Sequence, residues 1–446
     1  MPSTYTINKT LVDRPDAGSF QDSPDNRGKP ASPEDFVKLR PPRAVSGRHV
    51  VVLFDGTWNE DRNRTGDSIP TNVLRLFRDI IRPQSQVVPT PTSSTSQGPP
   101  PWPVVVRYYR GVGNAQDSGS MKRALFGATG HDELRIRATA LADLWSDHRA
   151  GDCIYLIGFS RGAASARLLA HDLSKGIPDR MSVTYKYVSN CLTAHIEPRL
   201  QKLDPGLLDI HKMPVIGEDS LKVRFLGCWD TVDAFVLPSR YPDSRLDKVI
   251  NLARRCLGRF SGRTGFTSGE RAIPKNVLAA AHCVAIDETR VEFLPSLMPA
   301  DPRVEEVWFP GVHTDVGGGY EENGLAHAPY EFIKLRLQLA MQLADGQEKA
   351  VRFDGAEHER ATPAPCFHFH SLNDGWRRWR RLLGMKRAMR FIGVLGSNAR
   401  PKLHVSYIDY VSKEVDVANR GGRKTWRVVY SPYNISALNG AYDIVN

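Results

Sequence analysis

Short apolar runs alternate with helical patterns from about residue 48 onward. Runs such as HVVVLFDG (residues 49–56), VVVRYYRG (residues 104–111) and CIYLIGFS (residues 153–160) are continuous aliphatic and aromatic stretches, which is typical of strands buried on both faces. Between them, segments such as ELRIRATALADLW (residues 133–145) and EFIKLRLQLAMQLA (residues 331–344) have the apolar spacing of amphipathic helices. The alternation predicts an α/β fold with a mostly parallel sheet and helices on both faces.

Composition shifts divide the chain into a domain, an arm and insertions. Residues 1–47 are rich in Pro, Ser, Asp and Gly and have no hydrophobic period, so we expect a disordered or loosely attached N-terminal arm. Residues 48–446 are predicted to form one domain. Within it, the Pro/Ser-rich residues 83–103 and the basic, Gly-rich residues 236–276 are predicted to be insertions.

The overall composition is that of a soluble globular protein. The chain has 446 residues, of which 41% are hydrophobic and 24% charged, and no apolar run approaches the roughly 18 residues that a membrane span needs. The first residues lack the apolar core of a secretory signal peptide, so a cytoplasmic location is expected. Six cysteines are scattered without C-x-x-C spacing, which favours buried free thiols over disulfides or zinc.

The stretch GFSRG, residues 158–162, follows one of the strand-like runs and precedes a run of small residues. A G-x-S-x-G sequence between a buried strand and a helix is the pattern of a nucleophile elbow, which would make Ser160 a nucleophile. Gly158 and Gly162 would allow the tight turn and a close helix approach. The alternative is that the Ser160 side chain only caps the helix.

A serine nucleophile needs a base and an orienting acid, which α/β-hydrolases supply in the chain order Ser, Asp or Glu, His. Asp230 ends the run LKVRFLGCWD, and His313 lies in the glycine-rich segment after VEEVWFPG, where a mobile base would be expected. Asp287, in HCVAIDETR, is a competing acid because it also follows an apolar run. Asp233 and Asp315 are weaker candidates, with Asp315 expected to support the histidine segment.

The first strand ends in FDGTWN, which raises the alternative of a phosphatase with a D-x-D-G-T nucleophile. That class needs an aspartate two residues before Asp55, and Leu53 stands there. In a hydrolase, this loop instead donates a backbone N–H to the oxyanion hole, and the residue after the serine donates another. The candidate donors are therefore Gly56 or Thr57, together with Arg161, while Asp55 is expected to hold the loop.

Positive charge is in excess. The formal net charge is +11, which favours anionic partners, and residues 376–395, WRRWRRLLGMKRAMRFIGVL, mix arginines with tryptophan, leucine and phenylalanine. This segment could bind an anionic lipid surface, but its basic and apolar positions are not cleanly segregated, so a packed helix with solvated arginines stays open. No motif supports nucleic-acid binding.

A set of sequence blocks resembles a known family. HVVVLFDGTWNE, PTNVLRLF, IYLIGFSRGAASARLLA, RFLGCWDTV, HCVAIDETR, VWFPGVHTDVGGGY and YSPYNI occur in that order and are similar to the DUF2235 family, which includes the catalytic domain of Tle1-like phospholipase effectors of type VI secretion. The resemblance implies an α/β-hydrolase fold, a triad on Ser160, Asp230 and His313, and glycerophospholipid esters as substrate. It also implies delivery to another cell by a secretion system, with the secretion apparatus or an immunity protein as partner.

From these observations we expect a serine esterase or lipase that needs no cofactor and no metal. Two alternatives remain: a soluble carboxylesterase of unknown substrate, and a catalytically silent protein that docks on membranes or partners.

Overall fold

The described part of the chain covers most of the predicted elements. The computed structural model describes residues 3–6, 47–56, 70–81, 102–111, 131–174, 221–232, 266, 270–290, 293–320, 323–346, 368–371, 389–419 and 425–446.

The elements of the amino-terminal half are β1 (Ser3–Thr6), β2 (His49–Phe54), α2 (Asn72–Ile81), β3 (Val104–Tyr109), α4 (His131–Asp147), β4 (Cys153–Phe159), α5 (Arg161–Leu173) and β5 (Val223–Trp229). They are followed by β6 (Ala280–Ala285), β7 (Val304–Phe309), α9 (His313–Gly317), the 3-10 helix η4 (Gly324–Ala326), α10 (His327–Asp345) and β8 (His368–Ser371). The last elements are β9 (Lys402–His404), α13 (Ser406–Tyr410), β10 (Glu414–Asn419), β11 (Thr425–Val429), α14 (Tyr433–Ser436) and β12 (Asp443–Val445).

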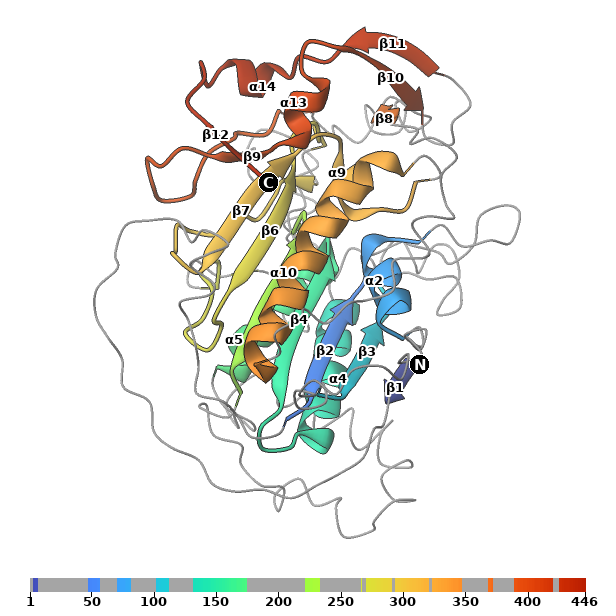
Figure 1. Cartoon of the computed structure of the whole chain (residues 1–446), viewed down its shortest axis with the longest axis vertical. Helices are drawn as coiled ribbons and strands as arrows, with labels where there is room; N and C mark the ends of the chain where they lie inside the picture. Colours follow the sequence, from blue (N-terminus) through green and yellow to red (C-terminus); the bar gives the residue numbers. More distant parts are fainter. Residues whose placement is uncertain are drawn as a thin grey trace, which may run out of the picture.

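One large sheet organises the molecule (Figure 1). Its strand order is β1-β3-β2-β4-β5-β6-β7-β9-β12. Strand β1 pairs antiparallel with β3, and the other neighbours pair parallel. The predicted mostly parallel α/β sheet is therefore confirmed, and the arrangement is that of an α/β-hydrolase-like fold.

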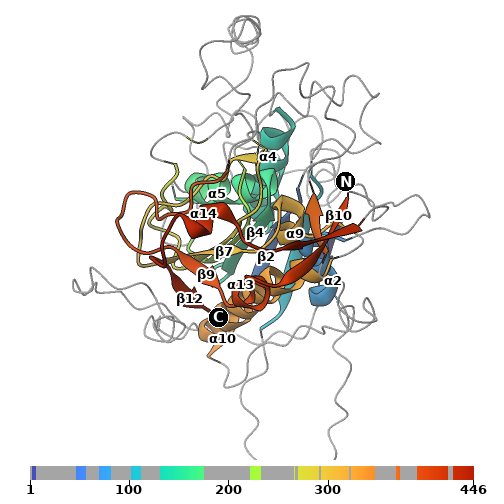
Figure 2. The same cartoon turned by 90° about the horizontal axis from the view of Figure 1, so that it is seen from above.

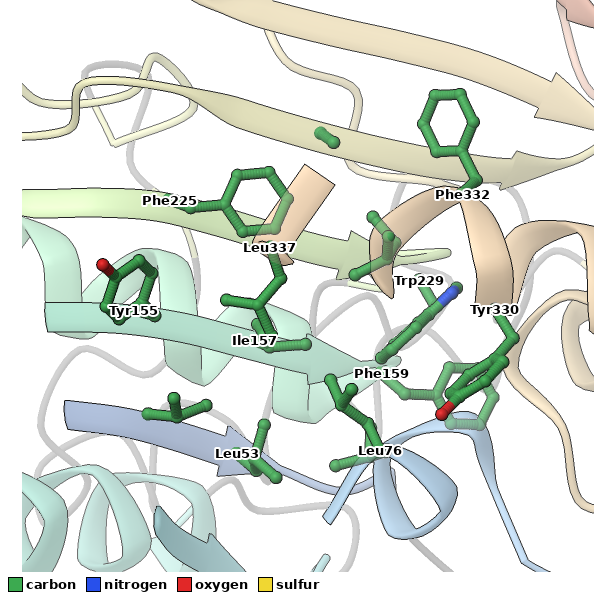
Figure 3. Close-up of a cluster of buried hydrophobic side chains, with 14 of the residues drawn as sticks. Leu53, Leu76, Tyr155, Ile157, Phe159, Phe225, Trp229, Tyr330, Phe332 and Leu337 are labelled. Carbon is green, nitrogen blue, oxygen red and sulfur yellow. The ribbon is translucent and has the colours of Figure 1, made fainter. Parts of the chain in front are cut away.

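Helices cover both faces of this sheet, as the view from above shows (Figure 2). Alternate residues of each strand point to opposite faces, and the core divides accordingly. Leu53, Tyr155 and Ile157 lie in one cluster with residues of α2 and α10 (Figure 3). Val52 and Leu156, one position away, lie in the other cluster with residues of α4 and α5. Burial on both sides explains why the strands are continuous apolar runs.

The chain changes direction across the sheet at β2. Strand β3 follows β2 in sequence and pairs on one side of it, while β4 pairs on the other side. Helix α2, which follows β2, packs in one core cluster, and α5, which follows β4, packs in the other. The connections after β2 and β4 therefore diverge to opposite faces, and this is the point where open α/β sheets form their ligand crevice.

The carboxyl-terminal elements pack over the ends of β6 and β7 (Figure 1). Val284, Ile286 and Trp308 from this part of the sheet share a third core cluster with residues of the last 60 positions, among them Ile392, Leu403, Tyr407, Tyr430 and Ile435. Strands β8, β10 and β11 form a separate three-stranded sheet. The terminal segment is thus built into the domain by apolar burial.

Several predicted segments lie wholly or partly outside the described residues. Of the predicted arm, residues 1–47, the structure describes strand β1 and Gly47; of residues 83–103, only the last two. Of residues 236–276 it describes Phe266 and residues 270–276, and of residues 376–395 it describes 389–395. The domain boundaries stay predictions. Among the described helices, none is long and apolar enough to cross a membrane.

Candidate active site

Ser160 lies on a sharp turn between β4 and α5. Its backbone has φ 58° and ψ −124°, a conformation that residues other than glycine rarely adopt because the side chain crowds the backbone. A Cβ on Gly158 would come within 2.4 Å of the Gly162 oxygen, and a Cβ on Gly162 within 2.3 Å of the Phe54 oxygen. Both glycines are therefore required by the close approach of β2, β4 and α5, as the elbow pattern predicts.

The Ser160 hydroxyl does not cap the helix. Its side chain makes no capping hydrogen bond to α5, and Ser160 Oγ lies 2.9 Å from His313 Nε2 instead. The capping alternative is thus wrong, and the hydroxyl is in contact with a side chain that can accept its proton.

His313 is held from both ends of its ring. Its Nδ1 lies 2.6 Å from Asp230 Oδ2. Because a carboxylate can only accept, Nδ1 carries the proton, and Nε2 is left to accept the proton of the Ser160 hydroxyl. This tautomer is the one that a general base acting on serine needs.

The environment of His313 differs from the mobile glycine-rich loop that the sequence suggested. His313 is the first residue of α9 and only 4% exposed. The Phe159 ring lies 4.7 Å and the Phe293 ring 4.8 Å from the imidazole, measured between ring centroids. Burial lowers the pKa of His313 below 6.5, and the hydrogen bond with Asp230 opposes this effect. The lowered pKa keeps the ring neutral and able to accept a proton at neutral pH.

Asp230 directly follows β5 and is completely buried. Burial by itself would raise the pKa of this carboxyl, but the positive charge of Arg390 and the hydrogen bonds with His313 and Arg390 outweigh burial and hold the pKa well below 3.8. The carboxyl also accepts a hydrogen bond from the Ala285 N–H at 2.9 Å. Asp230 is therefore ionised at any pH at which the protein is expected to work.

Asp287, the competing acid, lies elsewhere. Its Oδ2 accepts hydrogen bonds from the Gly311 N–H at 2.7 Å and the Tyr430 hydroxyl at 2.8 Å. Burial raises the pKa of Asp287 to about 7, against these two hydrogen bonds. The side chain holds the turn that precedes His313 rather than the imidazole itself.

The other two aspartates considered as acids have different positions. Asp315 Oδ2 accepts from the Val312 N–H at 3.0 Å at the start of α9, in keeping with the predicted support of the histidine segment. Asp233 lies outside the described residues. Of the acids that the structure describes at strand ends, Asp230 is the one in hydrogen-bond contact with the His313 imidazole.

The loop after β2 is organised around Asp55. The Asp55 carboxyl accepts hydrogen bonds from the Gly56 N–H at 2.7 Å, the Thr71 hydroxyl at 2.9 Å and the Tyr108 hydroxyl at 2.5 Å. The Gly56 N–H would have to exchange this acceptor for an oxyanion, and Thr57, the other candidate from this loop, lies outside the described residues. Arg161 opens α5, where the first N–H groups of a helix have no acceptor within it.

Sequence reasoning missed the role of Arg390. Arg390 is 2% exposed, with Nη1 2.6 Å from Asp230 Oδ1 and Nη2 2.9 Å from Asp230 Oδ2. Arg390 belongs to the basic segment, residues 376–395, whose arginines were expected to face solvent or lipid. No local pattern marks it as buried, because its partner lies 160 positions away in the sequence.

Comparison with protein families places the chain. Residues 48–334 match the family described as "T6SS, Phospholipase effector Tle1-like, catalytic domain". The chain belongs to this family. The match covers more than half of the chain and includes Ser160, Asp230 and His313, whereas Arg390 lies beyond it.

Similarity of this member of the Tle1-like family to solved structures is distant. An uncharacterized protein from Pseudomonas aeruginosa is 17% identical over 67% of this chain and 46% of its own, with a TM-score of 0.32. A Tle1 effector bound to the VgrG spike of the type 6 secretion system is also 17% identical over 66% of this chain and 56% of its own, with a TM-score of 0.32. An esterase from Thermogutta terrifontis, solved with butyrate bound, is 14% identical over 66% of this chain and 83% of its own, with a TM-score of 0.30.

The chain spans about half the length of the first two of these structures. Among curated proteins, no relative matches it. The family membership therefore comes from the match over residues 48–334.

Proposed function

We propose that this chain is a serine hydrolase that cleaves acyl esters, with Ser160 as nucleophile, His313 as general base and Asp230 as the orienting carboxylate. The observation that carries the proposal is the continuous hydrogen-bonded chain from Ser160 Oγ through His313 to Asp230 on a strained strand-to-helix turn. Nucleophile, base and orienting acid in hydrogen-bond contact are the signature of acyl transfer through a covalent intermediate.

The proposed reaction has two halves. Ser160 Oγ attacks the ester carbonyl carbon while His313 Nε2 takes the hydroxyl proton, and the negative oxygen that forms accepts hydrogen bonds from the N–H of Arg161 and from the loop after β2. His313 then gives its proton to the departing alcohol. Water, activated in the same way by His313, attacks the acyl-enzyme and releases the fatty acid and Ser160. Asp230 stabilises the imidazolium that exists during both halves.

The lipid substrate and the delivery route rest on family membership alone. Since the chain belongs to the Tle1-like phospholipase effector family, we propose glycerophospholipids as its substrate class, with release of a fatty acid in the manner of a phospholipase A. Delivery by a type VI secretion system, with a component of that apparatus or an immunity protein as partner, is proposed on the same ground. The three residues of the triad lend no support to these points, because the same constellation serves many ester substrates.

A fluorophosphonate probe tests the chemistry without knowledge of the substrate. Attack of Ser160 Oγ forms an O–P bond, expels fluoride and passes the proton to His313. We expect wild-type protein to be labelled, Ser160→Ala to be unlabelled, and Asp230→Asn and His313→Ala to react slower by about 10⁴-fold. Ser165→Ala, a buried serine one turn further along α5, is the matched control and should react like wild type.

Labelling that persists in a folded Ser160→Ala variant would overturn the nucleophile assignment. Product analysis by mass spectrometry on a phospholipid panel then tests the substrate class. Fatty-acid release from phospholipid vesicles supports the phospholipase proposal, whereas turnover of short soluble esters alone would identify a soluble carboxylesterase. An unlabelled wild type would favour the catalytically silent binding protein.

A further inference from the structure

We infer that Arg390 is a positioning residue for the proposed reaction: its guanidinium holds both carboxyl oxygens of Asp230 and thereby fixes the orientation of His313. The inference rests on the proposed function, since a positioning role has meaning only if Ser160, His313 and Asp230 act together. It adds a residue from beyond the family match, residues 48–334, to the site.

The contacts of Arg390 define one position for its side chain. Nη1 bonds to Asp230 Oδ1 at 2.6 Å and to the Ala285 carbonyl at 2.9 Å, while Nη2 bonds to Asp230 Oδ2 at 2.9 Å and to the Phe293 carbonyl. A planar guanidinium that binds both oxygens of a carboxylate constrains its rotation, which a single N–H donor does not. Asp230 Oδ2 is also the oxygen that faces His313 Nδ1, so Arg390 sets the direction from which the imidazole is held.

The backbone around Arg390 is anchored to the sheet. The Asn434 side-chain amide donates to the Ile286 carbonyl at 3.0 Å and to the Arg390 carbonyl at 3.4 Å. Ile392 lies buried in the core cluster that contains Val284 and Ile286. These contacts join the terminal segment to the end of β6, directly beside Asp230.

The charge of Arg390 affects the protonation of Asp230 and His313. Both Asp230 and Arg390 are buried, and an isolated buried carboxylate would be neutralised by a proton. Arg390 keeps Asp230 ionised and, at the same time, cancels part of the negative charge that His313 experiences. Among the described residues, the charged groups that face His313 from the packed elements are Asp230, Glu288 and Arg290. Without Arg390 the buried negative charge of the Asp230–His313 pair is uncompensated, so the pair takes up a proton at higher pH than in the wild type.

The chain contains a matched ion pair for comparison. Arg336 is also buried and binds Glu305 through Nε at 2.6 Å and Nη2 at 2.8 Å. Glu305 is the second residue of β7, whereas His313 follows the other end of that strand. A change at Arg336 therefore breaks a buried arginine–carboxylate pair near the amino end of β7 and leaves the contacts of Ser160, His313 and Asp230 in place.

The test uses the full-length chain and measures the rate constant of fluorophosphonate labelling against pH. For Arg390→Gln we expect a rate constant at least about tenfold lower, since a misplacement of about 1 Å can cost a hundredfold, with little change in the probe's binding constant. We also expect the acidic limb of the pH profile to move to higher pH. Arg390→Lys, which keeps the charge but not the two-point contact, should restore the acidic limb more fully than the rate.

Arg336→Gln is the structural control. It should lose stability, as breaking a buried ion pair does, while the labelling rate and the acidic limb stay as in wild type. A folded Arg390→Gln that reacts with wild-type rate and pH profile would overturn the inference. If the glutamine variant fails to fold, a folded Arg390→Lys with wild-type rate and pH profile would overturn it as well. A wild type that is not labelled at all would contradict the proposed function instead, which keeps the two failures distinct.

Discussion

Two aspartates at neighbouring strand ends show how strongly the surroundings of a carboxyl group determine its pKa. Asp230 follows β5 and is paired with Arg390 and His313, while Asp287 follows β6 and accepts from the Gly311 N–H and the Tyr430 hydroxyl. Burial is shared by both, yet the pKa of Asp230 lies well below 3.8 and that of Asp287 is raised to about 7. The difference arises because a cation compensates the charge of Asp230, whereas the described side-chain contacts of Asp287 are with neutral donors.

Asp287→Asn should therefore preserve the site, in contrast to Asp230→Asn. An amide oxygen can still accept from Gly311 and Tyr430, so labelling should stay within a fewfold of wild type. Because the pKa of Asp287 is higher in the folded state, about 7, than the ordinary 3.8, the native protein keeps a proton between these values that the unfolded chain loses. This group makes the free energy of unfolding fall as pH rises through that window.

Denaturant unfolding of both proteins at several pH values measures the effect. The stability of Asp287→Asn relative to wild type should increase between about pH 4 and pH 7, by an amount on the order of a few kcal/mol. A difference that stays constant over this range would contradict the raised pKa. A labelling loss as large as that of Asp230→Asn would instead restore Asp287 as a candidate for the triad acid.

At the scale of elements, the close approach of three backbones builds the elbow. Gly162 lies in the first turn of α5, where alanine is ordinarily the better helix former by about 1 kcal/mol. Here a Cβ would stand 2.3 Å from the Phe54 oxygen and 2.6 Å from the Asp55 oxygen. Both are backbone atoms, one in β2 and one directly after it, so they can move only together with the strand. Packing between β2 and α5 thus overrides helix propensity.

Gly162→Ala should accordingly destabilise the fold by about 1–3 kcal/mol, the cost of overpacking, and slow the labelling of Ser160 because β2 is pushed away from the elbow. Thermal or urea unfolding measures the loss of stability, and the labelling rate measures the effect on Ser160. Gly440→Ala is the control: no atom lies within 4 Å of its would-be Cβ, but φ is +79°, so it should lose stability for conformational reasons alone and react normally. Unchanged stability of Gly162→Ala would show that β2 and α5 are not in the close contact described.

At the scale of the whole molecule, net charge links the proposed site to its proposed substrate. The formal charge of +11 should concentrate the protein on anionic membranes by about 1 kcal/mol for each basic residue near the surface, and salt should screen this attraction. Of the basic segment, residues 376–395, the structure describes 389–395, where Arg390 is buried while Met389 and Phe391 are exposed. At least one arginine of this segment thus pairs with a buried carboxylate rather than with lipid.

Vesicle binding and vesicle turnover should therefore fall with ionic strength, whereas turnover of a short soluble ester should change much less. Combined charge reversal at Arg377, Arg378, Arg380 and Arg381, which lie outside the described residues, should mimic high salt with anionic vesicles. Co-sedimentation measures vesicle binding, and turnover of both substrates over the same salt series measures the effect on activity. Unaltered vesicle binding by the charge-reversed variant would remove these four residues from the membrane interaction.

The sequence by itself determined the parallel sheet, its two covered faces and the order of Ser160, Asp230 and His313 along the chain. Apolar periodicity reports local burial, and parallel strands end at a common edge, so residues after β4, β5 and β7 had to meet there. The sequence also placed Asp287 at such an end, after β6, and could not separate it from Asp230.

Only the tertiary structure placed Asp230, and not Asp287, in contact with the His313 imidazole and brought Arg390 to Asp230. This placement depends on side-chain direction and on a cation 160 positions away, neither of which leaves a periodic signal. An arginine among other basic residues resembles a solvated one in sequence, because the burial of a charge is determined by its distant partner and not by its neighbours. The surroundings of His313 likewise depend on distant residues: the glycines around it suggested a mobile loop, whereas the rings of Phe159 and Phe293 pack against the imidazole in the folded protein.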